Sequence, residues 1–316
     1  MKSAAAVPAV LVTALLAVAH ASAYPWPVRP FGQQHPIRGN FDDPRMLRGL
    51  IDITYDNPKS FHSGVDIQAR DGTPVYAIQG GIVSGQGTAV SIASPSLSPV
   101  APVIFGYWHV DRVVSDWQYV SAGQLLGYVH KGAGHVHLSE RRFGQYVNPL
   151  RRGGLTPYVD RTQPVINEVD IYAAGTTRKL DPTAVSGRID LVLDATDPPP
   201  LAPWGGWSGV VLSPERISWR GLFNGSWLPL GFQRLAVDFS VFQTEGLDDV
   251  YAFGTQQNAE NAPGVFRYWL ARGLDTDLLA DGPHAITISA SDVRDNTTTQ
   301  VFRFNVGAPT ASAPLP

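Results

Sequence analysis

The chain contains the stretches Phe61-His-Ser-Gly-Val-Asp66, Tyr107-Trp-His109 and Gly134-His-Val-His-Leu138, which place four His and one Asp in short, strand-like segments. The third stretch has the spacing H-x-H. Side chains two apart on a strand share a face, so its two histidines point the same way, about 7 Å apart. The His and Asp of the first stretch would lie roughly 13 Å apart on a straight strand. They meet only if the chain bends, and Ser63-Gly64 tolerates a bend.

Imidazole nitrogens and a carboxylate oxygen are common ligands of Zn²⁺. A catalytic zinc site uses three protein ligands and leaves a further position for water. Five candidate groups are present for three ligand positions. Two imidazoles therefore remain for proton transfer or for stabilising an oxyanion. This set of residues is typical of a metallohydrolase. No Glu stands in an H-E-x-x-H arrangement, so the general base cannot be the Glu of that class of metalloprotease.

Around these stretches the chain resembles the lysostaphin/LytM-type zinc metalloendopeptidase family of bacterial cell walls, from about residue 35 to residue 150. Several dispersed motifs occur in the family's order and spacing. They are His35–Arg45, Phe61–Ile67, Gly72–Ala77, Gly80–Val83, Tyr107–Val110, Val120–Gly127, Gly134–Leu138 and Asn148–Leu150.

The resemblance implies a single Zn²⁺ held by His62, Asp66 and His137. It implies that His109 and His135 are the two catalytic histidines beside the metal, and it leaves open which of them is the general base. The implied activity is endopeptidase hydrolysis of peptide crosslinks in peptidoglycan through a zinc-activated water.

The implied fold is all-β: a lysostaphin/LytM-type peptidase domain of the duplicated hybrid motif, with a second β domain after it. Two other functions stay open. Relatives of the same fold that have lost ligands regulate other wall hydrolases, so a catalytically weak, wall-binding regulator is the main alternative. The second is an adhesion module in which the C-terminal domain contacts the wall.

Composition agrees with β-rich domains. Charged residues make up 16% of the chain, which also holds 31 Gly and 26 Pro, a profile of turn-rich structure rather than long surface helices. The net charge of −3 and the lack of a dense Lys/Arg cluster exclude nucleic acid as a partner. The chain has no Cys, so disulfides, a lipid-modified Cys and a thiol nucleophile are also excluded.

The N-terminus predicts export. Lys2 precedes an apolar run from about Ala4 to Ala19, and Ala21-Ser-Ala23 has the small residues of a cleavage site. The run is shorter than the ~20 residues that span a membrane. Cleavage after Ala23 makes the mature protein secreted or periplasmic, associated with the wall and without stable membrane insertion.

The predicted domain order is a signal peptide (1–23), a zinc peptidase domain (24–155), a linker (156–164), an immunoglobulin-like β-sandwich (165–306) and a disordered tail (307–316). Alternating strands at 165–172 and 185–195, and a hairpin around Asp292–Asn296, carry the sandwich assignment. The region is longer than a simple sandwich, so insertions are expected at 198–280. A chain that ends near Gly154 is expected to keep some hydrolysis of soluble peptides.

Two groups of residues in the C-terminal half have a functional and a structural interpretation. The tryptophans could form a sugar-stacking surface, but packing inside the sandwich explains them more simply. Four aspartates could bind Ca²⁺, whereas turn and cap roles explain them as well. The residues concerned are Trp204, Trp207, Trp219, Trp227 and Trp269, and Asp194, Asp197, Asp292 and Asp295.

Overall fold

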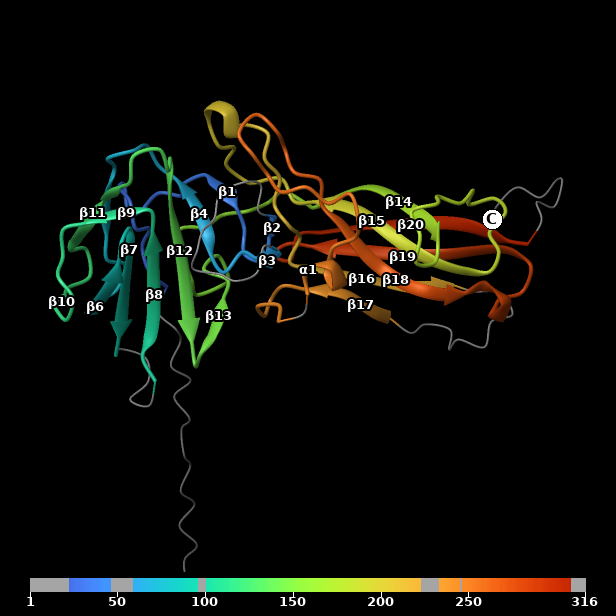
Figure 1. The fold of residues 1–316 in the computed structure, drawn as a ribbon, viewed down its shortest axis with the longest axis horizontal. Helices are drawn as coiled ribbons and strands as arrows, with labels where there is room; N and C mark the ends of the chain where they lie inside the picture. Colours follow the sequence, from blue (N-terminus) through green and yellow to red (C-terminus); the bar gives the residue numbers. More distant parts are fainter. Residues whose placement is uncertain (1–22, 47–58, 96–100, 223–232, 245, 308–316) are drawn as a thin grey trace, which may run out of the picture.

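The computed structural model describes residues 23–46, 59–95, 101–222, 233–244 and 246–307. The predicted signal peptide and tail lie outside the described residues, apart from Ala23 and Gly307. None of the helices in the described residues has the length and hydropathy needed to cross a membrane. Figure 1 shows an N-terminal half, coloured blue to green, beside a C-terminal half, coloured yellow to red.

The described residues form an all-β fold, which confirms the predicted class. The N-terminal half contains a large antiparallel sheet, a three-stranded sheet and a two-stranded ribbon. In spatial order, the large sheet consists of β1 (Ile37–Gly39), β4 (Val65–Gln68), β12 (His135–Arg142), β8 (Val103–Trp108), β7 (Ala89–Ser94), β6 (Gly81–Gln86) and β10 (Tyr119–Val120), with β13 (Gln145–Val147) paired to β12. The other strands are β5 (Pro74–Tyr76), β11 (Leu125–Val129) and β9 (Val110–Arg112), and β2 (Pro44–Met46) with β3 (Lys59–Phe61).

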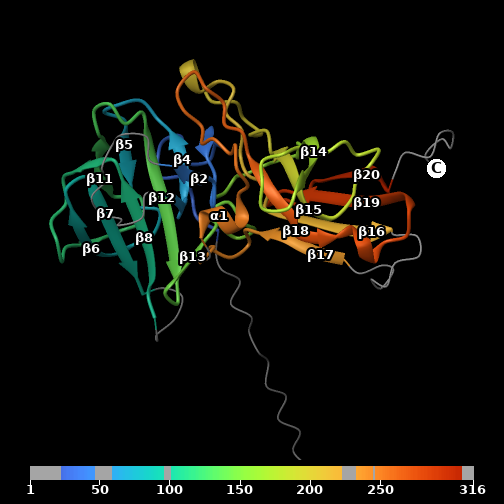
Figure 2. The ribbon, with the colours of Figure 1, turned by 45° about the vertical axis from the view of Figure 1, so that its right-hand side comes forward.

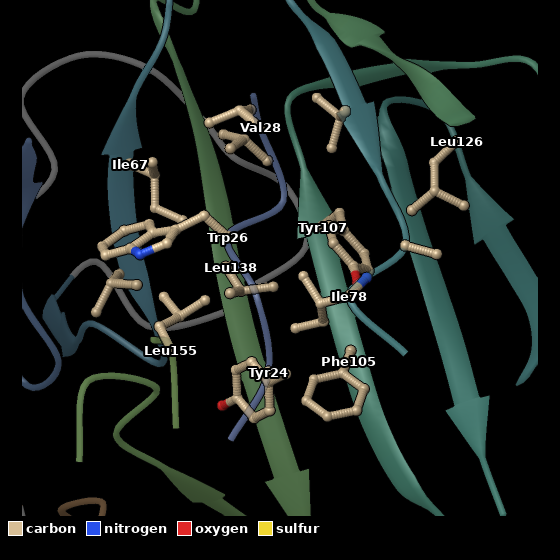
Figure 3. Packing of buried hydrophobic residues seen from close by; sticks show 14 of the residues in the cluster. Tyr24, Trp26, Val28, Ile67, Ile78, Phe105, Tyr107, Leu126, Leu138 and Leu155 are labelled. Atoms are coloured by element: carbon tan, nitrogen blue, oxygen red, sulfur yellow. The ribbon is translucent and has the colours of Figure 1, made fainter. Parts of the chain in front are cut away.

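The two-residue period of the strands separates a core face from a polar face. On β12, Val136 and Leu138 are fully buried in the hydrophobic core, while His135 and His137 alternate with them. Figure 3 shows the core side: Leu138 lies among Ile67, Tyr24 and Trp26, which come from β4 and from the N-terminal segment. The hydrophobic residues of β4 and β12 thus anchor the strands from one side and direct the polar residues to the other.

The C-terminal half contains two antiparallel sheets around a second hydrophobic cluster. One sheet has the order β14 (Val165–Ala173), β15 (Arg188–Thr196), β18 (Arg267–Asp275). The other has the order β17 (Gln233–Asp238), β16 (Arg216–Leu222), β19 (Gly282–Ser291), β20 (Thr297–Val306). In the described residues, short helices accompany them, namely η1 (Gly205–Trp207), α1 (Leu247–Val250) and η2 (Thr276–Leu278).

The predicted C-terminal hairpin is confirmed, because β19 and β20 pair in antiparallel register with Ser291 opposite Thr297. The region 198–280 is more than a set of insertions, since it supplies β16, β17 and β18 to the two sheets. The immunoglobulin-like assignment and the domain boundaries stay predictions.

The two halves lie side by side (Figure 2), and aromatic side chains connect them. Phe61, at the end of β3, belongs to the hydrophobic cluster of the C-terminal half, and its ring centroid lies 6.0 Å from that of Tyr251. The ring centroids of Phe41 and Phe242 are 5.7 Å apart. In the opposite direction, Leu212 joins the N-terminal cluster. The two cores therefore contact each other through apolar side chains.

This interface predicts that residues 24–155 alone are less stable than the full chain. Without the C-terminal half, Phe41 and Phe61 lose their partners, and each exposed ring costs about 1.5–3 kcal/mol. Thermal unfolding followed by circular dichroism should show a lower Tm for residues 24–155 than for the full chain. The full chain with Phe242→Ala should have a Tm between these two. Equal Tm values would contradict the prediction. A fragment that does not fold would show that the two halves share one core.

A buried carboxyl at the interface predicts a pH effect. Burial, together with neighbouring Asp43, raises the pKa of Asp42 to about 9. At a pH between the usual pKa of 3.8 and about 9, the Asp42 carboxyl is ionised in the unfolded chain and protonated in the folded chain. The folded state therefore loses up to about 1.4 kcal/mol per pH unit as pH rises. Asp42→Asn removes this loss. Urea unfolding at pH 5 and pH 8 should show a smaller decline in stability for the variant, and an identical decline would refute the assignment.

Candidate metal and catalytic site

The site lies where β3 turns into β4, opposite β12. β3 ends at Phe61 and β4 begins at Val65, so His62 lies in the bend between them. A Cβ at Gly64 would lie 2.3 Å from the Leu138 carbonyl oxygen and 2.8 Å from His137 Nε2. Only glycine allows the bend to approach β12 so closely. The bend that the sequence requires for His62 and Asp66 to meet is present.

The register of the sheet brings the predicted ligands together. Asp66 on β4 pairs directly with His137 on β12. The Asp66 Oδ1 atom lies 3.2 Å from His62 Nε2 and 3.2 Å from His137 Nδ1, and these two nitrogens are 2.7 Å apart. All three side chains are buried, and their ligand atoms lie within 4.8 Å of one another.

Two neighbouring groups orient these side chains. The Asn40 carbonyl oxygen lies 2.7 Å from His62 Nδ1, so a neutral His62 donates there and presents its Nε2 lone pair to the site. Arg45 donates to Asp66 Oδ2 at 2.7 Å, which leaves Oδ1 for the histidines. Arg45 belongs to a motif quoted above, but its contact with the ligand carboxylate could not be inferred from the sequence.

The charge states suit a cation. Burial lowers the pKa of His137 to about 3 and also lowers the pKa of His62, so both rings are neutral at pH 7. Burial alone would raise the pKa of Asp66, but His62, His135 and Arg45 outweigh it and hold that pKa well below its usual range. Two neutral imidazoles and one carboxylate thus direct electron pairs at one point.

His62, Asp66 and His137 could therefore hold a metal ion. Neutral imidazole nitrogen and carboxylate oxygen are the donors that Zn²⁺ accepts. The contact of His62 Nδ1 with a carbonyl and of Asp66 Oδ2 with Arg45 matches the usual support of metal ligands by outer hydrogen bonds. The residues present fit a zinc ion.

The two other histidines lie together beside this trio. His135, also on β12, has its Nε2 atom 3.4 Å from Asp66 Oδ1. The ring centroids of His109 and His135 are 4.4 Å apart. His109 lies between β8 and β9 with a φ of 64°, a left-handed conformation that is uncommon outside glycine. The structure thus brings all five predicted residues into one cluster.

Arg38 is a neighbour of the site that the sequence did not reveal. Its Nη2 atom donates to the Ala133 carbonyl oxygen at 2.9 Å and contacts His135 Nδ1. The guanidinium carbon lies 4.1 Å from the ring centroid of Trp207, in the C-terminal half. The sequence around Arg38 does not distinguish it from other arginines, because its contacts with His135 and Trp207 form only when the two halves pack together.

The loop that carries η1 also contacts the site strand β4. The side chain of Gln68 bonds the backbone of Trp204 twice, through the Trp204 nitrogen at 2.8 Å and its carbonyl oxygen at 3.0 Å. Figure 1 shows this yellow loop rising at the boundary between the halves, next to β4. Trp204 keeps 44% of its surface exposed. Trp204 and Trp207 thus lie near the site, whereas Trp219 and Trp269 pack within the C-terminal half, and Trp227 lies outside the described residues.

Two further histidines lie elsewhere. His35 packs its ring 5.4 Å from that of Trp26, and its Nε2 atom lies 3.2 Å from the Pro30 carbonyl oxygen. His130 is exposed and pairs with Asp111 at 2.7 Å.

Comparison with protein families shows a match of residues 60–149 to the model of Peptidase family M23. The match contains all five predicted site residues and confirms the resemblance to the lysostaphin/LytM-type peptidases for this part of the chain. This is a family of metallopeptidases, some members of which are catalytically inactive. A search of curated proteins found no match.

Solved structures that align with the chain have low TM-scores. A peptidase M23 protein from Pseudomonas aeruginosa is 21% identical over 40% of this chain and 52% of its own, with a TM-score of 0.25. A catalytic-domain variant of the prophage-encoded M23 protein EnpA from Enterococcus faecalis is 27% identical over 39% and 95%, with a TM-score of 0.27. A protein of Ruminococcus gnavus described as a glycyl-glycine endopeptidase LytM is 21% identical over 36% and 58%, with a TM-score of 0.22. This chain thus spans about half of the first of these proteins.

Proposed function

We propose that this protein is an exported zinc metalloendopeptidase that hydrolyses peptide crosslinks of bacterial peptidoglycan. The observation that carries the proposal is the convergence of His62 Nε2, Asp66 Oδ1 and His137 Nδ1 on one point, with His109 and His135 beside it. The match to Peptidase family M23 over the same residues supports the reaction class.

The site residues would bind the metal ion and keep its ligands in position. When bound, Zn²⁺ supplies a Lewis acid that polarises the scissile carbonyl and activates a water at neutral pH. His62, Asp66 and His137 would hold the ion. The single carboxylate of Asp66 would offset only part of the charge of the ion. Arg45 and the Asn40 carbonyl keep the ligands in place.

We assign proton transfer and oxyanion stabilisation to His109 and His135. Their adjacent rings can hold a proton at the face where a peptide carbonyl would bind, and donate a hydrogen bond as negative charge develops on its oxygen. Arg38 orients His135 from the Nδ1 side and leaves Nε2 directed at the ligand cluster. Which histidine removes the proton stays open.

Export is part of the proposal and is supported by the apolar run that follows Lys2 and by Ala21-Ser-Ala23. Tyr24, the expected first residue after cleavage, is buried, and its hydroxyl donates to Glu140. Its backbone nitrogen donates to the Gly154 carbonyl oxygen at 3.2 Å. Amino-terminal sequencing of the exported protein should therefore begin at Tyr24.

The substrate assignment is tested with crosslinked muropeptides. Incubation with the zinc-loaded mature protein should yield monomers with new amino termini, detected by mass spectrometry. Asp66→Asn is the matched control and should yield none. Release of intact stem peptides from the sugar would show an amidase and would refute the endopeptidase assignment.

The regulator alternative has a distinct outcome. A regulator would bind peptidoglycan and release no peptide, even with zinc bound. All five site residues are present in this chain, which favours the enzyme. A contact of the C-terminal half with the wall remains a proposal, and sedimentation of the full chain and of residues 24–155 with purified peptidoglycan would test it.

A further inference from the structure

A second group of buried carboxylates lies at the boundary between the halves and shares no residue with the proposed zinc site. Asp160 precedes β14, Asp197 directly follows β15, and Asp292 directly follows β19. All three are buried, and each offers a carboxylate oxygen within 4.8 Å of the other two. Three segments distant in sequence thus bring negative charge to one point.

Two of these carboxylates are held by neutral donors. Asp160 Oδ1 accepts from the Thr162 nitrogen at 2.9 Å, and its Oδ2 accepts from the Tyr158 hydroxyl at 3.2 Å. Asp292 Oδ1 accepts from the backbone nitrogens of Arg294 and Asn296, both at 2.8 Å. These bonds orient the carboxylates without neutralising them.

Asp197 differs from these two, because one of its carboxylate oxygens has no such donor among the described residues. The residue is only 3% exposed, and its Oδ1 atom has no hydrogen-bond partner among the residues that the structure describes. A buried carboxylate oxygen without a partner costs several kcal/mol unless the group is neutralised or coordinates a metal. Burial, followed by Asp292 and Asp160, raises the pKa of Asp197 well above its usual range. The group as it stands holds more carboxyl groups than nearby cations.

The Arg294 guanidinium lies close enough to Asp160 and Asp292 to interact with their charges. Arg294 donates through Nε to the Tyr158 carbonyl oxygen at 3.3 Å, and its guanidinium carbon lies 4.9 Å from the Tyr158 ring centroid. Within the described part of the chain, no Arg or Lys forms an ion pair within 4.0 Å with Asp160, Asp197 or Asp292.

We propose that Asp160, Asp197 and Asp292 bind one Ca²⁺ ion. The donors are oxygens alone, which favours a hard cation over Zn²⁺. Ca²⁺–oxygen distances of about 2.3–2.6 Å allow two ligands on one ion to lie up to roughly 5 Å apart, which fits the spacing of the three oxygens. Mg²⁺ prefers to keep several waters, which a buried site disfavours.

Such an ion would bind segments that contact both halves and would stabilise the interface between them. Asp160 lies in the segment that joins them, and Asp292 begins the β19–β20 turn. Val293, the next residue of that turn, belongs to the N-terminal hydrophobic cluster. The Asp197 nitrogen donates at 2.7 Å to the carbonyl oxygen of Leu212, which belongs to the same cluster. Calcium would thus stabilise the joint that also holds the η1 loop near the zinc site.

The test uses the full mature chain, freed of metal by chelation and then dialysed into chelator-free buffer. Isothermal titration with CaCl₂ should show one ion per chain. Asp197→Asn, which keeps the shape and removes the charge, should weaken binding at least about tenfold. Asp295→Asn, in the same turn with an exposed side chain, and Asp66→Asn, in the zinc site, should bind calcium normally.

Thermal unfolding separates the calcium site from a purely structural role. Calcium should raise the Tm of the wild type and of Asp295→Asn, and should raise the Tm of Asp197→Asn less at the same calcium concentration. Without calcium, Asp197→Asn should unfold at a higher temperature than the wild type, because it removes an uncompensated buried carboxylate. Absence of binding to the wild type at millimolar calcium, or loss of binding in Asp66→Asn, would overturn the proposal. Neither outcome bears on the proposed peptidase activity.

Discussion

Asp66→Ala is expected to release the metal ion and to abolish peptide hydrolysis. Asp66 Oδ1 lies 3.2 Å from each ligand histidine and supplies the only negative charge of the trio. Its loss leaves two neutral imidazoles that face the Arg45 guanidinium, whose partner is gone. Loss of supporting outer hydrogen bonds alone weakens metal sites about 10–100-fold, so loss of a ligand should exceed that range.

Metal content by mass spectrometry is the direct measurement, since it does not depend on the substrate. The wild type should carry one zinc per chain, and Asp66→Ala should carry almost none after dialysis. Asp116→Ala is a suitable control, because Asp116 is an exposed carboxylate paired with Arg112. Full zinc occupancy of Asp66→Ala would mean that the ion uses other ligands and would refute the assignment of Asp66.

His109→Ala and His135→Ala are expected to keep zinc and to lose turnover by around 10²–10⁴-fold, the range for general acid–base catalysis. Neither ring belongs to the trio of closest approach, but both lie beside it. Turnover of a soluble crosslinked peptide and zinc content should be measured on the same samples. His130→Ala, on the exposed side chain that pairs with Asp111, is the control and should stay active.

The results separate two errors in the assignment. Loss of zinc in His135→Ala would show that the two members of the H-x-H pair have been exchanged. Near-full turnover in either His109→Ala or His135→Ala, with zinc retained, would remove that residue from the mechanism and leave the other as the sole proton carrier.

Much of the site could be predicted because its geometry is local. The H-x-H spacing places His135 and His137 on one face of β12 through the two-residue period of a strand. The need for a bend between His62 and Asp66 follows from the length of an extended chain, and Gly64 is the residue that permits it. The hairpin at Asp292–Asn296 was predictable for the same reason, since turn residues separate two alternating strands.

The rest depended on contacts between distant segments. The sequence alone determined the all-β class and the five candidate groups, because these follow from composition, residue type and strand period. The division of these groups into ligands and catalytic histidines came from the resemblance of the motifs to a known family. Only the tertiary structure paired Asp66 with His137 across two strands, and set Arg38 between His135 and Trp207. It also brought Asp160 to Asp197 and Asp292, because burial and cross-chain proximity arise when the two cores pack, and no local pattern encodes them.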